Sequence, residues 1–288
     1  MIFQLSLSGF SLGIVYGLIA MGMVLIFRAV GVVNFAQGDF MMLGGFIAFA
    51  LNQQAGLPMG LCFGITALFM GLVGIAFQFI TYWPLRKAMD KTVVVSTLGA
   101  AIALREFCRL IWGPAPLAVD PFVKGTAKIG TAVIQWQYII IIGISAVLMT
   151  LVFLLLERTL VGNILQATAQ DQRTASLMGI PVIIAVAATF SISILITGLG
   201  GLLLAPVFFV TTNMGVLTGV KAFTAVIIGG FGSVQGAIIG GLIVGLTEAF
   251  AGAYISTTYR DAIVFVVLIV TLIIRPQGIF GEKTAEKV

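Results

Sequence analysis

Long apolar runs separated by short polar segments make up most of the hydrophobic pattern of this 288-residue chain. A helix needs about 20 mostly apolar residues to cross the hydrocarbon core of a bilayer. The pattern therefore predicts membrane helices over residues 5–27, 35–51, 57–82, 93–112, 136–156, 182–210 and 262–274, with a further apolar stretch over 220–254.

The stretch over residues 220–254 is too long for one crossing. A group of glycines interrupts it, and glycine gives the backbone the freedom that a turn between two helices requires. We expect two segments here, one or both of them short, with conformational roles for Gly229, Gly230, Gly232 and Gly236. The chain is thus predicted to be an all-α polytopic membrane protein. It has eight or nine transmembrane segments, some broken or short, in a single domain over residues 1–288.

Composition supports a lipid-embedded chain and excludes several kinds of chemistry. Hydrophobic residues make up 60% of the sequence and charged residues 9%, whereas a soluble domain carries about 25% charged residues. Histidine is absent, which excludes an imidazole general base and argues against a zinc site. No GxxxxGK[ST] phosphate-binding loop is present, so transport driven by ATP would need another subunit to bind the nucleotide. We expect no metal, no cofactor and no catalytic site in this chain.

The 15 Lys and Arg residues indicate the orientation of the chain. They form no basic stripe, so nucleic acid is not an expected partner. Loops on the cytoplasmic side are enriched in Lys and Arg, and the bias favours an N-terminus outside and a C-terminus inside. The loop over 113–135 is then outside and the loop over 157–181 inside. With Lys221 unassigned, the inner set is Arg28, Arg86, Lys87, Lys91, Arg158, Arg173, Arg275, Lys283 and Lys287, and the outer set is Arg105, Arg109, Lys124, Lys128 and Arg260.

The loop over 157–181 combines polar residues with good helix formers. This composition predicts a short amphipathic helix within the loop. Gly179 followed by Pro181 would end that helix.

Polar side chains at membrane depth mark candidate functional positions, because they are costly to place in lipid. Asn34, Gln37 and Asp39 lie close together before or within the second apolar run. They either line a path or gate at a broken helix, or form a cytoplasmic turn and helix start, and the sequence leaves both open. We expect replacement of Asp39 by alanine to reduce transport more than expression if the first interpretation holds.

Lys221 lies at the start of an apolar run, and Glu248 lies within one. They could pair, or either could face a water-filled cavity as part of a translocation path. For Lys221, a side chain that reaches the membrane interface is slightly favoured. Arg105 and Arg109 lie one helical turn apart, and lipid headgroups are favoured as their partners over a substrate.

Several short motifs occur in one order along the chain. Together they resemble the H-type permease subunits of bacterial branched-chain amino acid ABC importers, over nearly the whole chain. The motifs are Gly9, Leu12, Gly13 and 16–20; Asn34-Phe35-Ala36-Gln37-Gly38-Asp39; 169–171 and 175–180; 221–225, 229–233 and 236–237; 259–261; and 275–281.

The resemblance implies a bacterial inner-membrane importer in which this chain pairs with a second, M-type permease. Two ABC ATPase subunits would bind ATP and Mg, and a periplasmic solute-binding protein would deliver the solute. The loop over 157–181 would contain the coupling helix that docks on an ATPase. The residues expected to carry this docking are Gln170, Asp171, Arg173, Ala175 and Gly179.

The resemblance leaves the solute less defined. Members of this architecture import Leu, Ile and Val, while similar chains carry other amino acids, urea or short amides. A different class, an ion-coupled secondary transporter, would bind coupling ions at broken helices near the midplane, and Asn34, Asp39 and Glu248 could serve. A membrane-embedded enzyme is disfavoured because paired carboxylates and a nucleophile motif are lacking.

Overall fold

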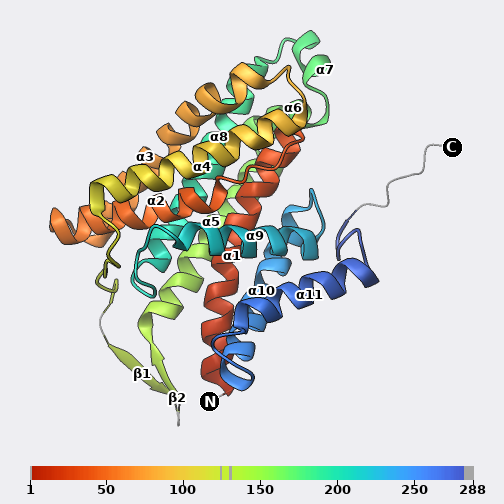
Figure 1. Ribbon diagram of the computed structural model, residues 1–288. Coiled ribbons are helices and arrows are strands. Elements are labelled where there is room, and N and C mark those ends of the chain that lie inside the picture. Colours follow the sequence, from red (N-terminus) through yellow and green to blue (C-terminus); the bar gives the residue numbers. More distant parts are fainter. Residues whose placement is uncertain (1, 124, 130–131, 282–288) are drawn as a thin grey trace.

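A computed structural model of the protein describes residues 2–123, 125–129 and 132–281. Helices dominate the described chain, with one two-stranded hairpin (Figure 1). The α-helices are α1 Ile2–Val30, α2 Gln37–Phe49, α3 Met59–Phe77, α4 Asp90–Trp112, α5 Trp136–Arg158, α6 Leu160–Gln170, α7 Gln172–Leu177, α8 Val182–Leu204, α9 Met214–Gly229, α10 Val234–Tyr254 and α11 Arg260–Ile274. The strands are β1 Thr126–Ile129 and β2 Ala132–Gln135. Short π-helical segments, Ala50–Gln54 and Gln78–Tyr82, continue α2 and α3, and a 3₁₀ turn, Trp83–Leu85, follows the second.

The predicted helical membrane architecture is confirmed in its main features. Five helices in the described residues are long and apolar enough to cross a membrane, namely Ile2–Val30, Met59–Leu85, Trp136–Arg158, Val182–Leu204 and Val234–Tyr254. The predicted total of eight or nine segments stays a prediction.

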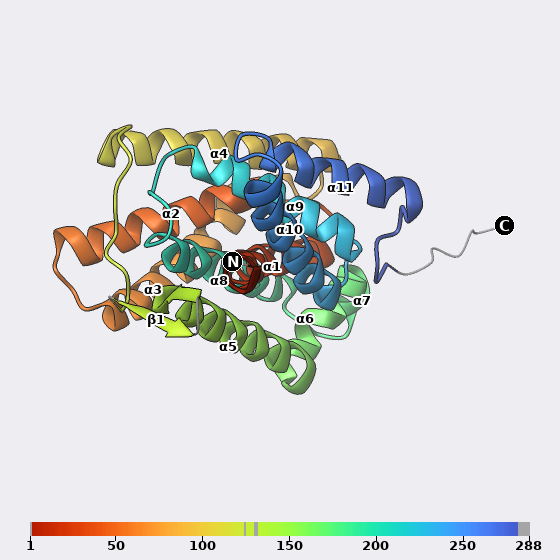
Figure 2. The same ribbon diagram turned by 90° about the horizontal axis from the view of Figure 1, so that it is seen from below.

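Helix α1 lies at the centre of the bundle, with the other long helices around it when it is viewed end-on (Figure 2). It packs against α10, α8, α9 and α5. Small residues bring α1 and α10 together. Glycines recur at four-residue spacing in both helices, at Gly9, Gly13 and Gly17 and at Gly241 and Gly245, and this spacing permits close helix contact. A methyl group on Gly13 would lie 2.8 Å from Cα of Leu242, so the backbones meet where only glycine fits.

The predicted break between residues 220 and 254 is confirmed. Helix α9 ends at Gly229, and α10 begins at Val234. Gly230 has a φ of +109° and Gly232 a φ of +87°, which are conformations that favour glycine. The hydroxyl of Ser233 then caps α10 by accepting a hydrogen bond from the backbone N–H of Gly236 at 3.0 Å.

Helix α9 begins six residues before the predicted segment, at Met214 instead of residue 220. The sequence signal is weak there because Gly215, Thr218 and Gly219 interrupt the apolar pattern. The structure explains the difference, since α9 crosses the interior and a methyl group on Gly219 would lie 3.2 Å from Cα of Gly38 in α2. Close contact with α2, and not an apolar run, therefore accounts for the first part of α9.

The two long loops lie at opposite ends of the bundle (Figure 1). The loop over 113–135 contains the β1–β2 hairpin near the N-terminal end of α1, with Thr126 paired to Gln135. The loop over 157–181 contains two helices, α6 and α7, where one was expected. Lys124, Lys283 and Lys287, which entered the charge bias, lie outside the described residues.

Candidate functional site: two polar clusters and a cavity

The Asn34–Asp39 segment forms the turn into α2, and its polar side chains bond to the protein. The side-chain oxygen of Asn34 accepts a hydrogen bond from the backbone N–H of Ala36 at 3.1 Å. Gln37, which is fully buried, donates through Nε2 to the hydroxyls of Ser193 at 3.0 Å and Thr197 at 2.5 Å in α8. Asn34 thus holds the turn before α2 and Gln37 connects the start of α2 to α8, and their role in a path or gate stays a prediction.

Asp39 is buried and pairs with Arg105 of α4. The guanidinium donates from Nε and Nη2 to Oδ1 of Asp39, each at 3.2 Å. The expectation that Arg105 and Arg109 share a lipid-headgroup role is therefore wrong for Arg105, because α4 packs against α2 and brings the guanidinium to a buried carboxylate. Arg109 is exposed and lies 3.7 Å from Glu106 on the same helix.

A cavity of about 280 Å³ lies beside the Asp39–Arg105 pair. Its walls are mostly apolar. Phe35, Ile102, Gly215, Gly219 and Phe223 are among the lining residues.

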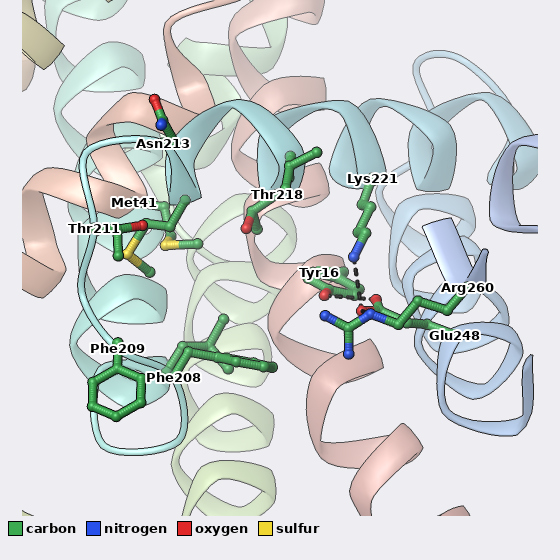
Figure 3. Close-up of a pocket in the computed structure, with 13 residues that line it drawn as sticks. Tyr16, Met41, Phe208, Phe209, Thr211, Asn213, Thr218, Lys221, Glu248 and Arg260 are labelled. Atoms are coloured by element: carbon green, nitrogen blue, oxygen red, sulfur yellow. Dashed lines mark hydrogen bonds and ion pairs between the residues drawn. The ribbon is translucent and has the colours of Figure 1, made fainter. Parts of the chain in front are cut away.

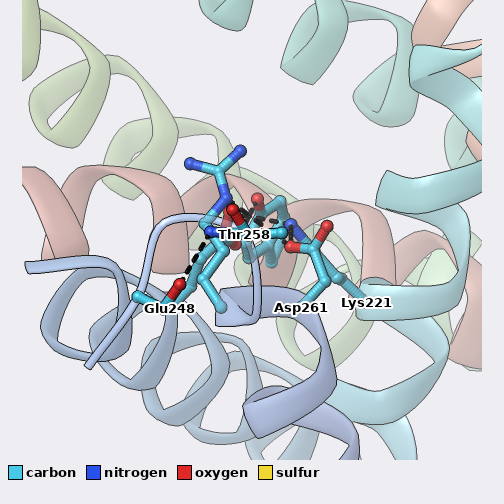
Figure 4. A network of polar contacts seen from close by, with 7 residues as sticks. Lys221, Glu248, Thr258 and Asp261 are labelled. Carbon is cyan, nitrogen blue, oxygen red and sulfur yellow. Dashed lines mark hydrogen bonds and ion pairs between the residues drawn. The ribbon is translucent and has the colours of Figure 1, made fainter.

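A second cluster joins α1, α9, α10 and α11 (Figure 4). The ammonium of Lys221 lies 2.7 Å from Oε1 of Glu248 and 2.8 Å from Oδ1 of Asp261. Tyr16 donates its hydroxyl proton to Oε2 of Glu248 at 2.8 Å. Arg260 approaches both carboxylates through Nε, at 3.6 and 3.7 Å.

The pairing of Lys221 with Glu248, one of the open alternatives, is the arrangement found. The favoured interpretation, a Lys221 side chain at the membrane interface, is wrong. Lys221 is only 4% exposed because α9 lies inside the bundle with α10 and α11 against it. Sequence reasoning also missed Tyr16, Arg260 and Asp261 as members of this cluster. A signal for two of them was available in the sequence, because Arg260 and Asp261 are adjacent opposite charges at the start of an apolar run.

A cavity of about 240 Å³ opens beside this cluster, and we call it the Arg260 cavity (Figure 3). It lies between the ionic cluster and Phe208, which belongs to the segment joining α8 to α9. Its lining contains both polar and apolar side chains. The lining residues are Tyr16, Met41, Leu204, Phe208, Phe209, Thr211, Asn213, Met214, Leu217, Thr218, Lys221, Glu248 and Arg260.

The residues expected to couple to an ATPase lie on α6 and α7 and just after them. Gln170 is the last residue of α6, and Asp171 caps α7 by accepting hydrogen bonds from the Thr174 hydroxyl at 2.6 Å and the Arg173 N–H at 2.8 Å. These bonds to Thr174 and Arg173 lower the pKa of Asp171 below its usual value. Ala175 is buried, which gives α7 a face packed against the bundle.

The end of α7 presents apolar side chains to the surroundings. Leu177 is 83% exposed and Met178 is 79% exposed. Gly179 follows with a φ of +82°, and the N–H of Ile180 bonds back to the carbonyl of Ala175 at 3.0 Å. Gln172 anchors this helix by donating to the carbonyl of Ala29 at 2.7 Å, next to the end of α1.

In the part of the chain that the structure describes, no group of three or more His, Cys, Asp or Glu could hold a metal ion. Cys62 and Cys108 are free and buried.

The sequence matches the family described as branched-chain amino acid transport system / permease component over residues 5–272. The chain belongs to this family. Members are transport subunits and not enzymes in themselves. The resemblance inferred from the motifs is thereby confirmed.

Named relatives match this permease over nearly its whole length. The high-affinity branched-chain amino acid transport system permease protein LivH of Escherichia coli (strain K12) is 33% identical over 302 residues, covering 99% of this chain and 97% of the relative. BraD of Pseudomonas aeruginosa, described in the same words, is 31% identical with the same coverage. A probable branched-chain amino acid transport permease protein LivH of Methanocaldococcus jannaschii is 27% identical, covering 92% of this chain and 88% of the relative.

The fold also has a solved counterpart. A chain of PsaBC from Streptococcus pneumoniae in complex with Fab aligns with a TM-score of 0.52, at 16% identity, over 94% of this permease and 91% of that chain. This likeness concerns the fold alone.

Proposed function

We propose that this chain is the membrane permease subunit of an ATP-driven ABC importer. The importer translocates branched-chain or related amino acids that a periplasmic binding protein delivers. The observation that carries the proposal is the match to high-affinity branched-chain amino acid permeases along 99% of the chain. Urea, short amides or other amino acids are the alternative solutes, because selectivity in such systems lies mainly in the binding protein.

The proposed topology places the N-terminus and the 113–135 loop in the periplasm, and the 157–181 loop and the C-terminus in the cytoplasm of a bacterial inner membrane. Helices α1 to α5 and α8 to α11 are then nine segments of a single permease domain over residues 1–288. The arrangement of the hairpin beside the N-terminal end of α1, with α6 and α7 at the other end, supports this assignment (Figure 1).

Helices α6 and α7 form the proposed docking element for the ATPase. A docking element must be stiff, because closure of the ATPases has to move the spans mechanically. The cap at Asp171 and the bond from Gln172 to Ala29 supply this stiffness. The exposed Leu177 and Met178 supply an apolar surface for the partner.

The remaining parts of the proposed importer are proteins that other chains supply. They are a second, M-type permease, two ABC ATPase subunits that bind ATP and Mg, and the solute-binding protein. Within this chain, the polar positions Asn34, Gln37, Asp39, Lys221 and Glu248 would belong to the translocation path or gate. Gly229, Gly230, Gly232 and Gly236 would let α9 and α10 change their mutual angle.

Reconstitution tests the proposal. The permease is co-purified with its partner subunits, placed in proteoliposomes and supplied with the binding protein and radiolabelled leucine. We expect uptake to require ATP and the binding protein. Uptake by the permease chain alone, driven by an ion gradient, would instead establish a secondary transporter.

A further inference from the structure

The Arg260 cavity contains hydrogen-bonding groups that the protein leaves unused. Both carboxylates of the cluster already have a cationic partner, because Glu248 accepts hydrogen bonds from Tyr16 and Lys221, and Asp261 forms an ion pair with Lys221. Arg260 differs from Lys221. Within the described residues its guanidinium makes ion pairs at 3.6 and 3.7 Å through Nε, and its two Nη groups donate no hydrogen bond.

The Nη groups of Arg260 are directed into the cavity, toward Phe208 (Figure 3). The side chain is 41% exposed, which leaves the outer edge of the guanidinium open to a solute. A guanidinium edge with two parallel N–H groups matches the two oxygens of a carboxylate, and this bidentate pair is both strong and directional.

An acceptor for a second charged group lies across the cavity. Thr218, on the side of α9 that faces the cavity, has a hydroxyl with no hydrogen-bond partner among the described residues. A hydroxyl oxygen can accept from an ammonium group. Apolar side chains also line the cavity, among them Phe208, Met214 and Leu217.

Charge balance restricts the kind of solute that the cavity accepts. The cluster contains two cations, Lys221 and Arg260, and two carboxylates, Glu248 and Asp261. A free cation or anion would leave a net charge in a site of low dielectric, which is costly. A zwitterion adds no net charge, and a cavity of about 240 Å³ has the scale of a small solute.

We propose that the Arg260 cavity is a binding subsite for a free amino acid with an aliphatic side chain. Arg260 binds the α-carboxylate, Thr218 accepts a hydrogen bond from the α-ammonium, and Phe208 packs against the side chain. This inference rests on the proposed function, and it adds direct contact between the permease and its solute.

Substrate protection tests the subsite without relying on transport rate. Leu217→Cys places a thiol on the cavity wall, where a methanethiosulfonate reagent can label it in the assembled importer. We expect leucine to slow this labelling, and 3-methylbutylamine, which lacks the carboxylate, to leave it unchanged. Ile255→Cys, which lies at the end of α10 outside the cavity, is the matched control and should be labelled at the same rate with and without leucine.

Changes at Arg260 give the second part of the test. In the Leu217→Cys background, Arg260→Gln should raise the leucine concentration for half protection by about tenfold, the loss expected for a hydrogen-bonded ionic contact. Arg260→Lys keeps the charge but lacks the two parallel N–H groups, and it should raise the half-protection concentration by a smaller factor. It also supplies the comparison if Arg260→Gln fails to assemble. Arg109→Gln, which neutralises an exposed arginine that does not line the cavity, should leave protection unchanged.

The outcomes separate the two proposals. Leucine import by the Leu217→Cys importer without protection, or equal protection with and without Arg260, overturns the subsite and leaves the proposed function intact. Protection by 3-methylbutylamine equal to that by leucine overturns the assignment of Arg260 to the carboxylate. If the unsubstituted importer carries no amino acid, the proposed function and the subsite both fall.

Discussion

The ammonium of Lys221 lies 2.7 Å from a carboxylate oxygen of Glu248, and both side chains are buried. Lys221 belongs to α9 and Glu248 to α10, the two helices joined by the glycine-rich turn. A buried charge is tolerated only with a partner. The pair therefore constrains how α9 and α10 can move relative to each other.

Removing both members of this pair should cost less than the two single removals added together. Glu248→Gln leaves Lys221 with Asp261 alone, and Lys221→Met leaves two carboxylates with only the more distant Arg260 as a cation. Each single change should cost about 3–5 kcal/mol, and the double change should cost less than the sum. Thermal unfolding of the purified importer measures this in a double-mutant cycle, and simple additivity would contradict direct pairing.

The pair of Asp39 and Arg105 makes a related prediction about transport. Asp39→Ala removes a buried partner of Arg105, and we expect transport to fall more than expression, because the pair fixes α4 against the start of α2. Uptake per amount of membrane-inserted protein is the measurement. Arg109→Gln is the control, since its exposed pair with Glu106 at 3.7 Å contributes about 1 kcal/mol or less. Equal loss of expression and transport in Asp39→Ala would indicate a purely structural role.

The cap at Asp171 should influence coupling. Asp171→Ala removes the acceptor for Thr174 and Arg173 and should loosen α7, which reduces stimulation of the ATPase by the loaded binding protein. Asp171→Asn keeps an acceptor oxygen and should retain most of the stimulation. Similar stimulation in Asp171→Ala and the unsubstituted importer would argue against α7 as the docking element.

The lowered pKa of Asp171 also gives a pH dependence. A carboxyl whose pKa is depressed in the folded state stabilises that state at pH values above its unfolded pKa, about 3.9. The contribution is complete at neutral pH and is lost as the pH falls through the folded-state pKa. The protection factors of the α7 amides, which correct for the intrinsic exchange rate at each pH, should therefore fall only in strongly acidic buffer. A fall in these protection factors between pH 7 and pH 5 would contradict the assignment.

The contact between α1 and α10 should not tolerate even one extra methyl group. Gly13→Ala places Cβ 2.8 Å from Cα of Leu242 and 2.9 Å from the carbonyl oxygen of Gly241, so a backbone must shift. A loss of about 1–3 kcal/mol is expected. Gly143→Ala on the exposed face of α5 is the matched control, because its new methyl group meets nothing within 4 Å. Equal unfolding temperatures for the two variants would show that the helices separate without cost.

The sequence by itself determined where most helices begin and end. Apolar runs gave α1, α3, α4, α5 and α11 to within a few residues, and the glycine group gave the turn before α10. The predicted start of α8 is confirmed, but its predicted end at residue 210 is wrong, because α8 ends at Leu204. These features are local, since hydrophobic length and backbone freedom are properties of neighbouring residues. The motif order likewise sufficed to indicate the family, which the full-length match confirms.

The tertiary structure alone decided which polar groups meet. Four helices bring residues that are far apart or only loosely spaced in the sequence into one cluster, namely Tyr16, Lys221, Glu248 and Asp261. The early start of α9 has the same origin, because contact with α2 at Gly38, and not hydrophobicity, makes that part of the helix favourable. Pairing of charges and close backbone contact depend on the packing of distant segments, and no local pattern encodes that packing.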